Sequence, residues 1–106
     1  MKRKIYMTPN ELPMEELLTT LAEESAELAQ ASLKLRRCLT QINPTPKSYE
    51  TCIDNILEEI GDVQLCLQAL GFTDAKYTDQ INAGIAKKIN RWTKRLTEKY
   101  NQEAKE

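Results

Sequence analysis

An acidic pattern that occurs twice constrains the fold of this chain more than any other feature. Each copy has two adjacent glutamates and a third carboxylate three residues after the second. The copies are Glu23, Glu24 and Glu27 and, 35 positions later, Glu58, Glu59 and Asp62. Both lie among aliphatic residues in helical sequence, where residues three or four apart share one face. Like charges about 4 Å apart repel by roughly 4 kcal/mol at a protein surface. The two triplets can therefore lie close together only if a cation compensates them.

Proline and glycine divide the chain into three long segments with helical spacing of apolar residues. The segments are expected over residues 13–41, 48–70 and 73–100. Proline suits the first turn of the first helix, and Gly71 suits the position after the second helix. Asn43–Pro46 interrupts the helical pattern, and no strand-like alternation competes with it. The expected class is all-α, with three long helices in an antiparallel bundle.

The length favours one domain over residues 1–106, with a core from about 13 to 100 and peripheral segments at 1–10 and 101–106. The last residues are polar and are expected to fray. A hydrophobic content of 41% supplies a core that three helices alone would bury only partly. We therefore expect a homodimer or a dimer of dimers.

The expected turn near residues 42–47 brings the two acidic copies to the same level of an antiparallel hairpin. Glu27 and Asp62 are nearly symmetric about its centre, and Glu24 falls about level with residues 63–66. Oxygen ligands without thiolate or imidazole select Mg²⁺, with Mn²⁺ as a substitute. The alternative is that the carboxylates form two solvated faces, but Glu24 interrupts an apolar series and the pattern recurs on the facing helix.

Several other sites are excluded by residue content. The chain has no histidine, which excludes Glu-x-x-His di-iron sites and His-based nucleophilic triads. No Gly-rich phosphate loop occurs. The three cysteines, Cys38, Cys52 and Cys66, are widely spaced, and we expect Cys66 to be a small buried hydrophobe.

The third helical segment carries a run of basic residues. Lys88, Arg91 and Arg95 share a face at i, i+3 and i+7, beside Trp92. These cations are candidates for phosphate binding. The alternative is a solvated face with favourable charge near a helix C-terminus. Trp92 suits either stacking on a base or a packed core, and Gly61 suits either close helix packing or space for a ligand.

Bulk charge and hydropathy bear on partners and location. The net charge of −1 favours neither a nucleic acid polymer nor an anionic membrane as a partner. No apolar run is long enough to span a bilayer, and residues 1–7 lack the apolar stretch of a signal peptide. The expected location is cytoplasmic.

These residues resemble a known family. The pattern Glu23-Glu24-x-x-Glu27 followed by Glu59-x-x-Asp62, with a basic third helix, is similar to the all-α nucleoside triphosphate pyrophosphohydrolases of the MazG type. The resemblance covers roughly residues 17–96. That superfamily also contains dimeric dUTPases, dCTP pyrophosphatases and phosphoribosyl-ATP pyrophosphohydrolases. The 31 residues between the motifs (28–58) form a rather long connection, which leaves the choice of substrate open.

The resemblance implies roles for individual residues. It implies Mg²⁺ ligation by Glu24, Glu27, Glu59 and Asp62. It implies that Glu23 and Glu58 order or deprotonate a metal-bound water, and that Lys88 and Arg91, with Lys94 or Arg95, bind phosphates. The expected function is Mg²⁺-dependent hydrolysis of a (deoxy)nucleoside triphosphate to its monophosphate and pyrophosphate. The alternatives are another nucleotide substrate, such as phosphoribosyl-ATP, or a non-catalytic helical interaction module.

Overall fold

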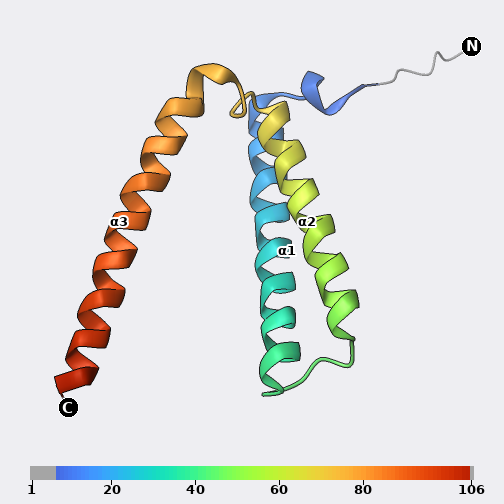
Figure 1. The fold of residues 1–106 in the computed structure, drawn as a ribbon. Helices are drawn as coiled ribbons and strands as arrows, with labels where there is room; N and C mark the ends of the chain where they lie inside the picture. The colour runs from blue at the N-terminus through green and yellow to red at the C-terminus, as the bar shows by residue number, and fades with distance from the viewer. Residues whose placement is uncertain (1–6, 106) are drawn as a thin grey trace, which may run out of the picture. The chain divides into compact units, whose positions relative to one another are not determined.

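The computed structural model describes residues 7–105, and within that range the chain is helical with no strands (Figure 1). The elements are η1 (Pro9–Glu11), α1 (Met14–Thr40), α2 (Tyr49–Ala69) and α3 (Ala75–Lys105). The all-α class and the three long helices expected from the sequence are confirmed. The expectation that residues 1–7 are no signal peptide falls on Met1–Tyr6, which lie outside the described residues, and on Met7. None of the described helices combines the length and the apolar character that crossing a membrane requires.

The chain divides into two compact units, residues 1–72 and 73–106, and each is described by itself. The first unit contains η1, α1 and α2; the second contains α3. The single domain and the helical bundle expected from the sequence stay predictions.

In the first unit, α1 and α2 lie side by side and run in opposite directions (Figure 1). The loop between them turns where Gln41 and Asn43 adopt left-handed conformations, with φ of 58° and 49°. Asparagine tolerates this conformation better than most residues because its short side chain bonds to the local backbone. The expected antiparallel pairing of the two helices is therefore observed.

Local capping fixes both ends of α2. Ser48 precedes the helix, and its hydroxyl accepts a hydrogen bond from the Thr51 amide at 3.2 Å. At the other end, Gly71 has a φ of 81°. The Gly71 amide donates to the Gln68 carbonyl at 2.9 Å, and the Phe72 amide donates to the Leu67 carbonyl at 3.0 Å. These two bonds form a Schellman motif, which confirms the expected role of Gly71.

The core between α1 and α2 is small. Its buried side chains are Leu17, Ala31, Cys52 and Cys66. Cys66 is thus the buried small hydrophobe that the sequence predicted, and Cys52 is another. Most remaining apolar side chains of the hairpin are partly exposed, and Ile60 of α2 is 37% exposed. Two helices can cover only one face of each other, so the hairpin alone leaves much apolar surface open.

The second unit is a single long helix whose bounds differ from expectation at both ends. Thr73 was expected to cap this helix, but α3 begins at Ala75, two residues after Thr73. Asp74 precedes it, and the Asp74 carbonyl accepts from the Tyr77 amide at 3.0 Å. At the other end α3 continues to Lys105, five residues beyond the end expected near Tyr100. No proline or glycine follows Gly84, so nothing in the local sequence stops the helix.

The apolar stripe of α3 has no neighbouring element within its own unit. Its side chains are 45–56% exposed, namely Ile81, Ile85, Ile89, Trp92 and Leu96. An amphipathic helix of this kind obtains its stability from packing rather than from propensity, so this stripe requires a partner surface.

Candidate metal centre

Four carboxylates converge between the two helices of the hairpin. Each offers one oxygen, and these oxygens all lie within 4.8 Å of one another. The four residues are Glu24 and Glu27 of α1 and Glu59 and Asp62 of α2. Helical spacing places the two members from each helix on one face, and the antiparallel pairing brings the faces together. The expected meeting of the acidic copies is thus observed.

Two of these carboxylates have oxygens that are removed from water and left without a partner. Glu24 and Glu59 are half-buried, and the Oε2 atom of each is buried without a hydrogen bond. A buried polar atom without a hydrogen bond carries an unfavourable desolvation free energy. Both atoms therefore require a proton or a cation.

The electrostatics of the cluster agree with that requirement. Burial, the neighbouring Glu27 and the charges of Asp62 and Glu59 raise the pKa of Glu24 to about 7. The pKa of Glu59 is also raised, first by burial and then by the charges of Glu27 and Asp62. Near neutral pH the cluster therefore holds protons that a bound cation would displace.

The one thiol beside the cluster is a poor ligand. Cys66 is 6% exposed. Burial, followed by the negative charges of Glu24 and Asp62, raises the pKa of its thiol. Metal binding needs the thiolate, and a raised pKa keeps the thiol protonated. The available donors are consequently four hard oxygen atoms, which suit Mg²⁺, Mn²⁺ or Ca²⁺ rather than softer metals.

The size of the cluster also suits a small divalent cation. Oxygens around a single Mg²⁺ are at most about 4.2 Å apart, which is twice the Mg–O distance. The four oxygens all lie within 4.8 Å of one another, which is close to this maximum. The donors and their spacing therefore fit a hard divalent ion.

The two glutamates predicted to act on water lie at the edge of this site. Glu23 and Glu58 directly precede Glu24 and Glu59, and both side chains are exposed. Neither belongs to the group of four convergent carboxylates. Successive residues on a helix point about 100° apart, which places these two beside the cluster rather than within it.

The predicted phosphate-binding cations belong to the other unit. Lys88, Arg91 and Arg95 of α3, together with Lys94 and Glu98, line a shallow cavity of about 380 Å³. The predicted i, i+3, i+7 face is thus present on one helix, within a unit that does not contain the carboxylates.

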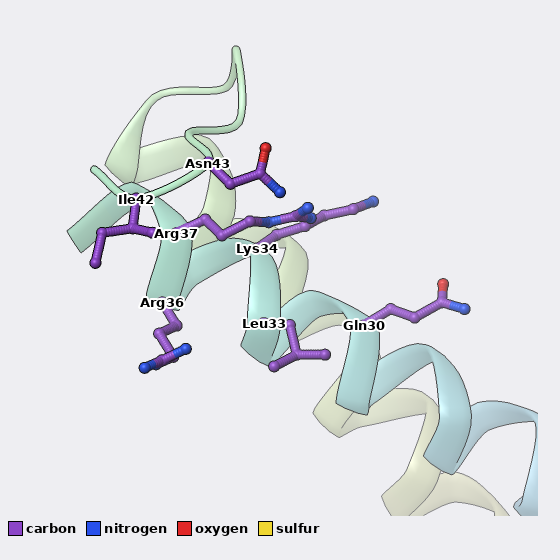
Figure 2. A pocket seen from close by; sticks show the side chains of 7 residues that line it. All are labelled: Gln30, Leu33, Lys34, Arg36, Arg37, Ile42 and Asn43. Carbon is purple, nitrogen blue, oxygen red and sulfur yellow. The ribbon is translucent and has the colours of Figure 1, made fainter. Parts of the chain in front are cut away.

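Sequence reasoning missed a second basic region, at the C-terminal end of α1. Lys34, Arg36 and Arg37 line a cavity of about 490 Å³ in the first unit (Figure 2). Its signal was available, because Glu27, Lys34 and Arg37 follow i, i+7, i+10 spacing along one face of α1.

Comparison of the chain with protein-family models, with curated proteins and with solved structures finds no significant match.

Proposed function

We propose that the protein is a Mg²⁺-dependent nucleotide pyrophosphohydrolase that converts a (deoxy)nucleoside triphosphate to its monophosphate and pyrophosphate. One observation carries the proposal: four carboxylates from two helices converge within 4.8 Å, and two of them have buried oxygens without partners. The resemblance of the two acidic motifs to the MazG-type enzymes supplies the reaction. A solvated acidic surface, by contrast, has no need to bury the oxygens of Glu24 and Glu59.

In this proposal Glu24, Glu27, Glu59 and Asp62 hold the metal. When bound, a divalent cation neutralises phosphate charge and lowers the pKa of a coordinated water. Glu23 and Glu58 are exposed beside the cluster, where either carboxylate has access to solvent and to a proton from an attacking water. Phosphate binding by Lys88, Arg91 and Arg95 of α3 through charge-assisted hydrogen bonds stays a prediction from the resemblance, because these residues belong to the second unit.

The test is turnover of canonical and modified nucleoside triphosphates by the purified protein with Mg²⁺, and with EDTA as control. Product identity decides the bond that is cleaved: monophosphate with pyrophosphate indicates the α–β bond, whereas diphosphate with phosphate indicates the β–γ bond. EDTA-sensitive pyrophosphate release from one or a few nucleotides supports the proposal and narrows the substrate. Phosphoribosyl-ATP belongs in the same panel as the alternative substrate.

The same experiment separates the enzyme from a non-catalytic interaction module. A module predicts no release across the panel and no effect of Mg²⁺ on the melting temperature. The enzyme predicts both effects, because a ligand that binds only the folded state raises its stability. Absence of both would contradict the proposed function.

A further inference from the structure

A basic pocket lies at the C-terminal end of α1, within the same unit as the carboxylates. Its volume is about 490 Å³, which is in the range of small-molecule sites. Seven residues line it: Gln30, Leu33, Lys34, Arg36, Arg37, Ile42 and Asn43. The lining contains three cations and no acidic residue, so the pocket has an uncompensated positive charge. An anion is the complementary ligand.

One of these cations has an unfilled hydrogen-bonding position. The Nε of Arg37 is buried, and it has no hydrogen-bond partner among the described residues. In Figure 2 the side chains of Lys34 and Arg37 extend in the same direction beside the amide of Asn43, whereas Arg36 points elsewhere. The ammonium of Lys34 and the terminal guanidinium nitrogens of Arg37 are donors of the kind that bind phosphate oxygens.

Capping of α1 does not explain these cations. Basic residues are often favourable at a helix C-terminus because they compensate the last carbonyls. Here the carbonyls of Arg36, Arg37 and Cys38 have other donors. The Thr40 hydroxyl donates to the Arg36 carbonyl at 3.0 Å, and the Gln41 amide donates to the Arg37 carbonyl at 3.0 Å. The Gln41 side chain donates to the Cys38 carbonyl at 2.6 Å. Among the described residues, no hydrogen bond joins the side chain of Lys34, Arg36 or Arg37 to these carbonyls, so capping does not occupy the basic side chains.

We propose that this pocket is a binding site for the phosphate group of a small molecule, with Lys34 and Arg37 as its principal donors. Gln30 and Asn43 supply neutral polar groups, and Leu33 and Ile42 supply exposed apolar surface for the rest of the ligand. The pocket continues the face of α1 that carries Glu27. Lys34 lies two helical turns, or about 10.5 Å, beyond that carboxylate. The phosphate belongs either to the substrate of the carboxylate site or to a separate phosphorylated molecule.

The test is calorimetric titration of the metal-free protein, in EDTA, with inorganic pyrophosphate. No turnover is involved, so the result does not depend on the proposed function. The cations of α3 line a second basic cavity, so this site is identified as the part of the pyrophosphate binding that substitution of Lys34 and Arg37 removes. The double variant Lys34→Gln/Arg37→Gln is expected to weaken binding at least about tenfold, because hydrogen bonds to charged groups are lost.

The matched control removes the same number of charges elsewhere. Lys47→Gln/Lys105→Gln alters two exposed lysines outside the pocket and is expected to change the affinity less than about twofold, since exposed charges are screened. Equal weakening by both variants, or no binding of pyrophosphate by the wild type, would overturn the proposal. Circular dichroism of the variants confirms that the helices are retained, and the single variants Lys34→Gln and Arg37→Gln provide independent tests.

Nucleotide kinetics with Mg²⁺ then assign the source of the phosphate. A raised KM in Lys34→Gln/Arg37→Gln assigns it to the substrate, and an unchanged KM assigns it to a second molecule. Pyrophosphate binding without any turnover would leave this site standing while the proposed function fails. Turnover without pocket-dependent binding of pyrophosphate would overturn this site while the proposed function stands.

Discussion

At the scale of single residues, the carboxylate cluster combines strong mutual repulsion with incomplete solvation. The raised pKa values of Glu24 and Glu59 are the direct result, and burial contributes more to each than any neighbouring charge. Such a cluster is unfavourable for the metal-free fold. Groups arranged for ligand binding often destabilise the ligand-free fold in this way, because the charge of the ligand is needed to balance theirs.

Neutralising one metal ligand should therefore stabilise the metal-free protein and at the same time abolish its activity. We expect Glu59→Gln and Asp62→Asn each to abolish pyrophosphate release, because each removes an anionic oxygen donor. In EDTA the same variants should melt a few degrees higher than the wild type, since repulsion is relieved. Melting curves with and without Mg²⁺, together with turnover assays, measure both effects. Undiminished activity of Asp62→Asn would contradict the site assignment.

Substitution of the exposed Glu23 or Glu58 should reduce activity less than substitution of a metal ligand does. Loss of a general base typically costs about 10²–10⁴-fold in rate. We expect Glu23→Gln or Glu58→Gln to lower kcat by this amount while the Mg²⁺-induced rise in melting temperature is retained. Loss of that Mg²⁺ response would show that the altered glutamate holds metal instead.

The pH dependence of stability follows from the pKa of Glu24. Its pKa rises from a usual value near 4.5 to about 7 on folding. Between these two values the folded chain binds more protons than the unfolded chain, so the free energy of unfolding falls as pH rises. In EDTA, the melting temperature should decrease across this window. Scans between pH 4.5 and 8 measure it, and a flat profile would contradict the assigned pKa.

Added Mg²⁺ should oppose the fall of the melting temperature with rising pH. Metal binding displaces the protons held by Glu24 and Glu59, so Mg²⁺ affinity should increase as pH rises through about 7. The stabilisation by a fixed Mg²⁺ concentration should grow over the same range. Calorimetry in buffers of different ionisation enthalpy measures the released protons.

At the scale of elements, Gly61 within α2 and Gly71 just beyond its end should respond in opposite ways to substitution by alanine. Gly61 lies within the helix, and an added Cβ there would meet nothing within 4 Å. Close packing within the described structure therefore does not explain this glycine. Gly71→Ala, by contrast, places a side chain at a φ of 81°, which an L-residue rarely adopts.

We expect Gly61→Ala to raise the free energy of unfolding by about 0.5–1 kcal/mol and Gly71→Ala to lower it by about 1 kcal/mol. Urea denaturation measures both values, and each variant is the control for the other. If Gly61→Ala stabilises the fold but impairs turnover, the open space beside Gly61 is used by a ligand. A destabilising Gly61→Ala would instead point to a close contact with another chain.

At the scale of the whole molecule, the apolar stripe of α3 is the feature that most requires a partner. We expect sedimentation equilibrium to give a mass of two or four chains. Ile85→Glu, which places a charge in that stripe, should shift the protein toward the monomer and lower its melting temperature. Lys87→Glu on the same helix alters a polar position and is the control. A monomeric wild type would contradict the expected oligomer.

The sequence by itself determined the all-α class, the three helices and the level at which the acidic motifs meet. These properties depend on local signals: helical periodicity, the break at Asn43–Pro46, and a glycine suited to a left-handed C-terminal position. They also depend on the short turn, because a short loop between long helices permits only antiparallel neighbours. The helix end at Lys105 was missed because an exposed polar terminus carries no stop signal.

Only the tertiary structure decided which groups are desolvated. The burial of Glu24 Oε2 and Glu59 Oε2, and the exposure of Glu23 and Glu58, depend on how closely two helices approach and on their rotation about their axes. The pocket around Lys34 and Arg37 likewise depends on the path of the loop past the end of α1. Periodicity gives the face on which a side chain lies, but burial is a property of all the neighbouring atoms together.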